Sequence, residues 1–180
     1  PGLNWDRYRV LLTTVHRREN WGEPLSHIIE GLQLILDKFP DTALLLPLHR
    51  NPTVRNPIQT ALGNHSRVFL TEPLDYAQLV GAMQRCYILL TDSGGLQEEA
   101  PSLGKPVLVL RDNTERTEAV TAGTARLVGT NPDAILQAAS ELLENAKVYE
   151  RMALAINPFG DGRAAERIVQ IIEEYLARPR

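Results

Sequence analysis

Short apolar runs alternate along the chain with longer segments in which apolar residues recur every three or four positions. The short runs are typical of strands that are buried on both faces, and the longer segments of amphipathic helices. We predict strands at residues 9–14, 42–48, 68–70, 88–91, 107–110 and 125–128. We predict helices at residues 25–39, 76–85, 94–103, 118–122, 132–145, 148–155 and 164–177. One more helix should begin between Pro52 and Pro57 and end at Gly63.

Six strands with helices between them predict an α/β fold with a doubly wound, mainly parallel, Rossmann-like sheet. The expected strand order, numbered along the chain, is 3-2-1-4-5-6. In this order strands one and four are neighbours, and a crevice opens at their carboxyl ends, where ligands bind in such folds. The chain shows no repeat or flexible linker, so we expect a single domain over residues 1–180.

The composition excludes several classes of protein. With 180 residues and 43% apolar side chains, the chain can bury a core and is not a disordered protein. A net charge of −3 gives no field that would attract nucleic acid. No apolar run approaches the ~20 residues that span a membrane. The single cysteine, Cys86, fits a cytoplasmic protein, and the sequence begins without an initiator Met or a signal peptide. We expect a piece of a longer protein.

The segment after the fourth predicted strand contains Asp92, Ser93, Gly94 and Gly95 at the start of a helix. Paired glycines let the backbone approach a ligand, and the start of a helix presents free N–H groups that bind anions. Ser93 adds a hydroxyl donor, and the Glu99 carboxylate could accept hydrogen bonds from a ribose. The alternative is that Ser93 only caps the helix and the glycines only form the turn.

Basic residues follow the neighbouring strands. His16 and Arg17 come after the first strand, His49 after the second, and a polar loop at residues 111–116 after the fifth. Imidazole and guanidinium groups suit a pyrophosphate, although such loops are often only solvated surface. The sequence lacks a P-loop lysine motif, zinc-ligand spacing and the three-glycine dinucleotide fingerprint, so we expect neither a metal nor a cofactor. The residues alone indicate a phosphate-bearing ligand, most simply a nucleotide.

Several motifs resemble the non-hydrolysing UDP-N-acetylglucosamine 2-epimerase family. They are His-Arg-Arg-Glu-Asn at residues 16–20, Thr-Asp-Ser-Gly-Gly-Leu-Gln-Glu-Glu-Ala-Pro at 91–101, Gly-Lys-Pro-Val-Leu-Val at 104–109, Thr-Glu-Arg at 114–116 and Asn-Pro-Phe-Gly-Asp-Gly at 157–162. The resemblance covers nearly the whole chain in the order of the family's motifs. It implies the carboxyl-terminal half of a two-domain protein of the glycosyltransferase-B type, whose amino-terminal half is a missing partner.

The resemblance also implies roles for individual residues. UDP would be bound by Ser93, Gly94, Gly95, Glu99 and Arg116. His16 would be a catalytic or leaving-group residue at the pyrophosphate. A second, activating UDP-N-acetylglucosamine would contact Arg17, Glu19 and His49. The parent protein would be a cytoplasmic homodimer of cell-surface polysaccharide biosynthesis, and this half alone would be nearly inactive, because the family's acid and base carboxylates lie in the other half.

Alternatives remain open from the sequence. They are a hydrolysing epimerase, a glycosyltransferase of the same architecture, and a stand-alone regulatory domain that binds nucleotide sugars. The apolar stripe on the last predicted helix bears on this question. The resemblance implies that this helix crosses to the other half of the protein, whereas a stand-alone domain would pack it on its own sheet.

Overall fold

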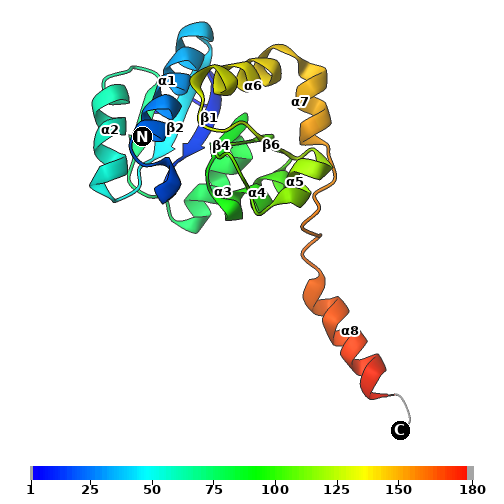
Figure 1. The fold of residues 1–180 in the computed structure, drawn as a ribbon. Helices are drawn as coiled ribbons and strands as arrows, with labels where there is room; N and C mark the ends of the chain where they lie inside the picture. The colour runs from blue at the N-terminus through cyan, green and yellow to red at the C-terminus, as the bar shows by residue number, and fades with distance from the viewer. Residues whose placement is uncertain (1, 178–180) are drawn as a thin grey trace.

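The computed structural model describes residues 2–177 and contains a six-stranded sheet (Figure 1). The strands are β1 (Arg9–Thr14), β2 (Thr42–Pro47), β3 (Val68–Thr71), β4 (Ile88–Thr91), β5 (Val107–Val109) and β6 (Ala125–Leu127). Their order is β3-β2-β1-β4-β5-β6, and every neighbouring pair is parallel. The predicted fold class and strand order are therefore confirmed. Residues 1 and 178–180 of the predicted domain lie outside the described residues.

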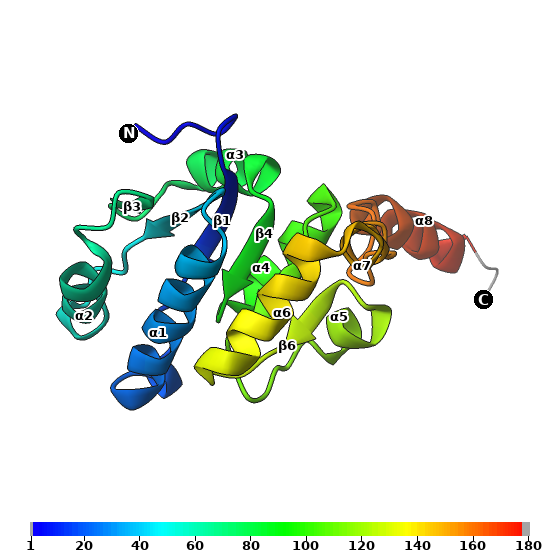
Figure 2. The same cartoon turned by 90° about the horizontal axis from the view of Figure 1, so that it is seen from above.

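Helices cover both faces of the sheet (Figure 2). They are α1 (Glu23–Lys38), α2 (Pro52–Leu62), α3 (Tyr76–Arg85), α4 (Gly94–Glu99), α5 (Thr117–Ala122), α6 (Pro132–Glu144), α7 (Ala146–Ala153) and α8 (Ala164–Leu176), with short 3-10 turns η1 (Arg18–Asn20) and η2 (Ala100–Leu103). One apolar cluster joins α1, α2, α6 and α7 to the sheet. A second cluster joins α3, α4 and α5 to the opposite face. The two clusters hold the sheet rigid beneath its carboxyl-terminal edge.

Proline shapes two helices, and only the second of them differs from the prediction. Helix α2 begins at Pro52, since the Asn51 side chain accepts a hydrogen bond from the Thr53 N–H, and Pro57 lies inside the helix. The helix predicted at 94–103 is divided into α4 and η2 at Pro101, which has no N–H to continue the α-helical pattern. The divided helix leaves α4 as a short element directly after β4.

The two central strands end side by side. Strand β1 pairs with β4, and the hydroxyl oxygens of Thr14 and Thr91, the last residues of these strands, lie 2.6 Å apart. Both hydroxyls lie at the carboxyl ends of strands whose other central residues are mainly apolar. They mark the point where the chain leaves the sheet toward the candidate site.

Helix α8 lies apart from the sheet. None of its residues is buried, and Figure 1 shows it at the end of an extended segment that leaves α7. Helix α8 therefore does not pack on the sheet of this domain. Such packing was the expectation for a stand-alone domain. No helix in the described part of the chain is long and apolar enough to cross a membrane.

Candidate functional site

Asp92 is the buried centre of the site. It follows β4 directly, and its side chain has no exposed surface. One carboxylate oxygen, Oδ2, accepts hydrogen bonds from the backbone N–H of His16 at 2.9 Å, from that of Arg17 at 2.8 Å, and from the Asn20 side chain at 3.1 Å. Asn20 also donates to the Leu110 carbonyl oxygen at 3.0 Å. Asp92 therefore fixes the loop after β1 to the end of β4.

The same carboxylate holds the His16 ring. Nδ1 of His16 lies 3.0 Å from Oδ1 of Asp92, an oxygen that has no other hydrogen-bond partner among residues 2–177. Burial favours the neutral form of Asp92, but the His16 ring and the N–H groups of Arg17 and His16 outweigh burial and lower its pKa below the ordinary value. Because Nδ1 of His16 faces Asp92, Nε2 lies on the opposite side of the ring.

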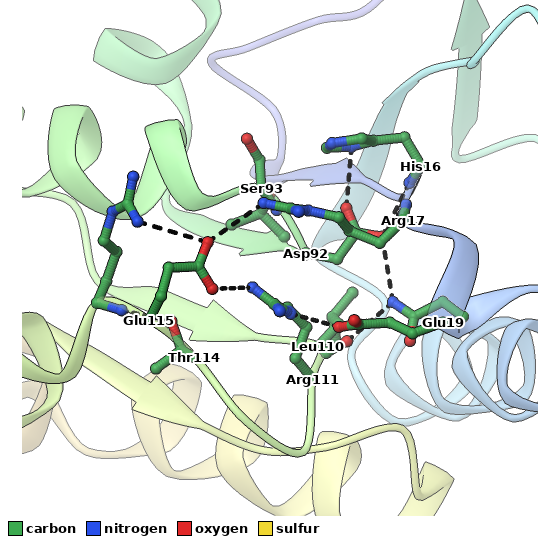
Figure 3. Close-up of polar contacts among 12 residues, drawn as sticks. His16, Arg17, Glu19, Asp92, Ser93, Leu110, Arg111, Thr114 and Glu115 are labelled. Atoms are coloured by element: carbon green, nitrogen blue, oxygen red, sulfur yellow. Dashed lines mark hydrogen bonds and ion pairs between the residues drawn. The ribbon is translucent and has the colours of Figure 1, made fainter.

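The first turn of α4 is a candidate anion site. Ser93 occupies the N-cap position, yet its side chain makes no capping hydrogen bond. The structure therefore does not support the alternative that Ser93 only caps the helix. Figure 3 shows its side chain directed away from Asp92, on the side where the His16 ring lies. The Ser93 hydroxyl and the free N–H groups that begin α4 are available donors for an anion.

Glu99 lies beside this turn with an unsatisfied oxygen. Its Oε2 is buried and has no hydrogen-bond partner among residues 2–177. Its Oε1 lies 3.9 Å from the position that a Cβ on Gly95 would take. A buried carboxylate oxygen without a partner is costly, and hydroxyl groups of a ligand would satisfy it.

Charged side chains of the loop after β5 close the other side of the site. Glu115 accepts from Arg17 Nη2 at 3.3 Å and from Arg111 Nη1 at 2.7 Å, and Arg116 Nη1 lies 3.5 Å away (Figure 3). Arg111 also pairs with Glu19, and Arg116 with Glu98. The backbone N–H of Glu115 itself and its bond to Arg111 lower the pKa of this carboxyl. The loop thus carries a network of alternating charges.

The structure brings most predicted site residues together in two groups. The His16 and His49 rings lie with their centroids 6.2 Å apart and their planes inclined by 25°. Arg17 and Arg116 gather around Gly94: a Cβ on this glycine would lie 3.5 Å from Arg17 Nη2 and 3.6 Å from Arg116 Cζ. Glu19 is paired with Arg111, which also bonds Glu115, the partner of Arg17.

The sequence reasoning assigned no role to Asp92, Asn20 or Gln97. Gln97 is buried, donates to the Ser93 carbonyl oxygen at 3.1 Å, and accepts from Thr114 at 2.6 Å, which ties α4 to the loop after β5. A usable signal was present for Asp92, because it is a carboxylate placed directly after a fully buried central strand. Asn20 and Gln97 gave no comparable signal, since their partners are distant in sequence.

A Rossmann-like sheet with an uncapped helix start and a histidine held at its carboxyl edge defines one half of a two-domain protein of the glycosyltransferase-B type. The family model for UDP-N-acetylglucosamine 2-epimerase matches residues 2–173. The chain belongs to this family.

Individual relatives agree with this assignment. A Neisseria meningitidis UDP-N-acetylglucosamine 2-epimerase is 48% identical over 167 residues, which cover 93% of this chain and 45% of the relative. The structure of Staphylococcus aureus MnaA with UDP has a TM-score of 0.90 and 48% identity, and covers 96% of this chain and 47% of that one. The N. meningitidis epimerase bound to UDP-GlcNAc has a TM-score of 0.89 and 47% identity, with coverages of 94% and 46%. The chain spans about half the length of the curated relatives that it matches.

Proposed function

We propose that this chain is the UDP-binding half of a non-hydrolysing UDP-N-acetylglucosamine 2-epimerase. The whole protein would interconvert UDP-N-acetylglucosamine and UDP-N-acetylmannosamine. Family membership supports the reaction class, and two similar structures are named for their complexes with UDP and with UDP-GlcNAc. In this proposal residues 1–180 form one domain, the amino-terminal half is a separate partner domain, and the parent is a cytoplasmic homodimer.

The proposed position of UDP rests on the unsatisfied Glu99 oxygen beside the first turn of α4. The ribose hydroxyls donate to Glu99, and the phosphates accept from Ser93 and from the N–H groups of Gly94 and Gly95. Arg116 reaches the same phosphates from the loop after β5. Of these groups, the Ser93 hydroxyl makes no capping hydrogen bond and Glu99 Oε2 has no partner among residues 2–177, whereas Arg116 is paired with Glu98 and Glu115.

The proposed reaction is an elimination followed by an addition. A base removes the proton from C2 of the sugar, and the bond between C1 and the UDP oxygen breaks, which gives a glycal and free UDP. UDP then adds again to C1 while C2 is protonated from the opposite face. His16 stabilises or protonates the departing pyrophosphate, with Asp92 holding its ring. The missing half supplies the acid and base carboxylates, so this chain alone is inactive.

A second UDP-N-acetylglucosamine would act as an activator in the cleft between the halves. Arg17, Glu19 and His49 belong to this proposed regulatory site. The position of His49 beside His16 supports a contact between activator and reaction centre. Glu19 must leave Arg111 to take part, so we expect this side of the site to form only when both halves are present.

Calorimetric titration of the chain with UDP, uridine and inorganic phosphate tests the binding site. We expect saturable binding of UDP and much weaker binding of uridine, because the phosphates make most of the proposed contacts. Ser93→Ala should weaken UDP binding by about 1–3 kcal/mol, the range for a hydrogen bond to a charged group. Ser66→Ala, which alters an exposed serine in a turn, is the matched control.

Two results would contradict the proposal. A folded chain that does not bind UDP, or a Ser93→Ala variant with unchanged affinity, would remove the site from the start of α4. Release of free N-acetylmannosamine by the full-length parent would exclude the non-hydrolysing reaction while leaving UDP binding intact.

A further inference from the structure

The Glu115 side chain covers the start of α4. A Cβ on Gly94 would lie only 2.8 Å from Oε1 of Glu115, so this oxygen is in close contact with the glycine. Gly94 is the first residue of α4, where the proposed site receives a phosphate. A carboxylate oxygen therefore occupies the neighbourhood in which the ligand's own anionic oxygens are expected.

Glu115 also forms ion pairs with the arginine side chains that would bind a phosphate. Its Oε1 lies 3.3 Å from Arg17 Nη2 and 3.5 Å from Arg116 Nη1, and its Oε2 accepts from Arg111 at 2.7 Å. Guanidinium groups bind carboxylates and phosphates by the same forked hydrogen bonds, so the two anions compete for them.

The three arginines depend on Glu115 to different degrees. Arg111 keeps a second carboxylate in Glu19, and Arg116 keeps one in Glu98. The ion pair of Arg17 within residues 2–177 is with Glu115, and its Nε is buried without a partner. The Glu115 side chain is 43% exposed, whereas that of Arg111 is 10% exposed, so Glu115 can turn into solvent while Arg111 stays in place.

We infer that Glu115 is an internal stand-in for a ligand phosphate, which neutralises Arg17 and Arg116 in the free protein and must be displaced when UDP binds. This inference rests on the proposed function and adds regulation of the same site. On binding, Arg116 exchanges the carboxylate for phosphate oxygens of UDP, and Arg17 is released from Glu115 for the proposed regulatory site. Glu115 then lowers the affinity for ligands that carry phosphate, because the phosphate must compete with the Glu115 carboxylate for the arginines.

Glu115→Gln tests this exchange, because it removes the charge and keeps the shape of the side chain. We expect UDP to bind this variant roughly fivefold more tightly than the unaltered chain, the scale of a partly exposed ion pair. Uridine, which carries no phosphate, should bind both equally. The gap for UDP should narrow as salt is added, since salt screens exposed charges. Glu118→Gln, at an exposed position in the first turn of α5, is the control and should bind UDP like the unaltered chain.

Glu115→Ala provides a second neutral variant and should show the same gain for UDP. If both variants bind UDP as tightly as the unaltered chain or more weakly, Glu115 positions the arginines and does not compete with the ligand, and the inference is wrong. That result would leave UDP binding by the unaltered chain, and the proposed function, intact. If both variants bind UDP about fivefold more tightly than the unaltered chain, the inference is supported. If no form binds UDP, the proposed site and the inference both fail.

Discussion

Asp92 is a buried charged residue that both stabilises the fold and forms part of the candidate site. Burial of its carboxylate raises its pKa, yet the His16 ring and the backbone N–H groups of Arg17 and His16 keep that pKa below the ordinary value near 3.9. A carboxyl whose pKa is lower in the folded chain than in the unfolded chain stabilises the fold above the unfolded value. That stabilisation is lost as the pH falls from about 4 through the lower, folded-state pKa.

Asp92→Asn should therefore destabilise the chain in a pH-dependent way. The amide keeps one acceptor oxygen but removes the charge, and we expect the free energy of unfolding at pH 7 to fall by about 1–3 kcal/mol. The difference from the unaltered chain should narrow below about pH 4, where Asp92 itself becomes protonated. Urea unfolding between pH 3 and pH 7 measures both effects, with the exposed Asp6→Asn as the control. A difference that does not change with pH would show that the Asp92 charge contributes nothing.

The same residue shows where prediction of the site from sequence ends. Ser93 and the two glycines could be assigned because the end of a buried strand and the start of a helix are both local patterns. The partners of Asp92 lie 75 and 76 positions earlier in the chain, so its role depends on two loops meeting in space. The orphan oxygen of Glu99 likewise exists only once its neighbours are packed.

At the scale of elements, Arg67 joins three parts of the fold. It lies just before β3, and its guanidinium donates to the carbonyl oxygens of Leu36 at 2.6 Å and of Phe39 and Thr42 at 2.9 Å. These carbonyls belong to the last turn of α1 and to the turn that leads into β2. A cation at the end of a helix also interacts favourably with the helix dipole. Arg67 therefore fixes α1 at the amino-terminal edge of the sheet, opposite the candidate site.

Arg67→Met should lower the free energy of unfolding by about 1.5–3 kcal/mol, because it keeps the length of the side chain but removes charge-assisted hydrogen bonds to partly buried carbonyls. Arg126→Met is the matched control. Arg126 pairs with Glu141, both side chains are well exposed, and its loss should change stability by at most about 1 kcal/mol. Urea unfolding measures both variants. Equal losses would mean that Arg67 acts only as another surface charge.

The element boundaries divide into those that sequence patterns determine and those that they do not. The periodic apolar positions of α1 and α6 place both helices within a few residues, because a long amphipathic face has only one register that buries it. The sequence pattern alone does not fix the start of α2, because Pro52 and Pro57 are both compatible with a first turn. The hydrogen bond from the Thr53 N–H to the Asn51 side chain decides between them.

At the scale of the whole molecule, α8 differs from every other helix. Its apolar side chains are between 51% and 75% exposed: Ile168, Val169, Ile171, Ile172, Tyr175 and Leu176. Exposed apolar surface of this extent on one helix marks an interaction site. The periodicity predicts the stripe but not what covers it, because the covering surface is not on the described sheet. We expect the missing half of the parent protein to bind this stripe.

Shortening the chain tests whether α8 contributes to the fold of the half-domain. A chain of residues 1–160 lacks α8 but keeps Phe159, which packs on the second apolar cluster. We expect its free energy of unfolding to agree with that of the full chain within about 0.5 kcal/mol, as for other changes at exposed positions. In sedimentation, the shortened chain should self-associate less than the full chain, because the exposed apolar stripe of α8 is absent.

A chain of residues 1–145, which also lacks α7, is the comparison. It loses the buried Met152 and the Tyr149 ring, whose centroid lies 4.3 Å from that of Tyr87 and whose hydroxyl donates to the Tyr87 carbonyl oxygen at 3.0 Å. Deleting a buried methionine side chain alone costs about 2–5 kcal/mol, so we expect a loss at least of this size. The contrast between the two shortened chains locates the end of the cooperative unit between α7 and α8. If residues 1–160 proved as unstable as residues 1–145, α8 would pack on this half in solution, and the missing half would not be needed to cover it.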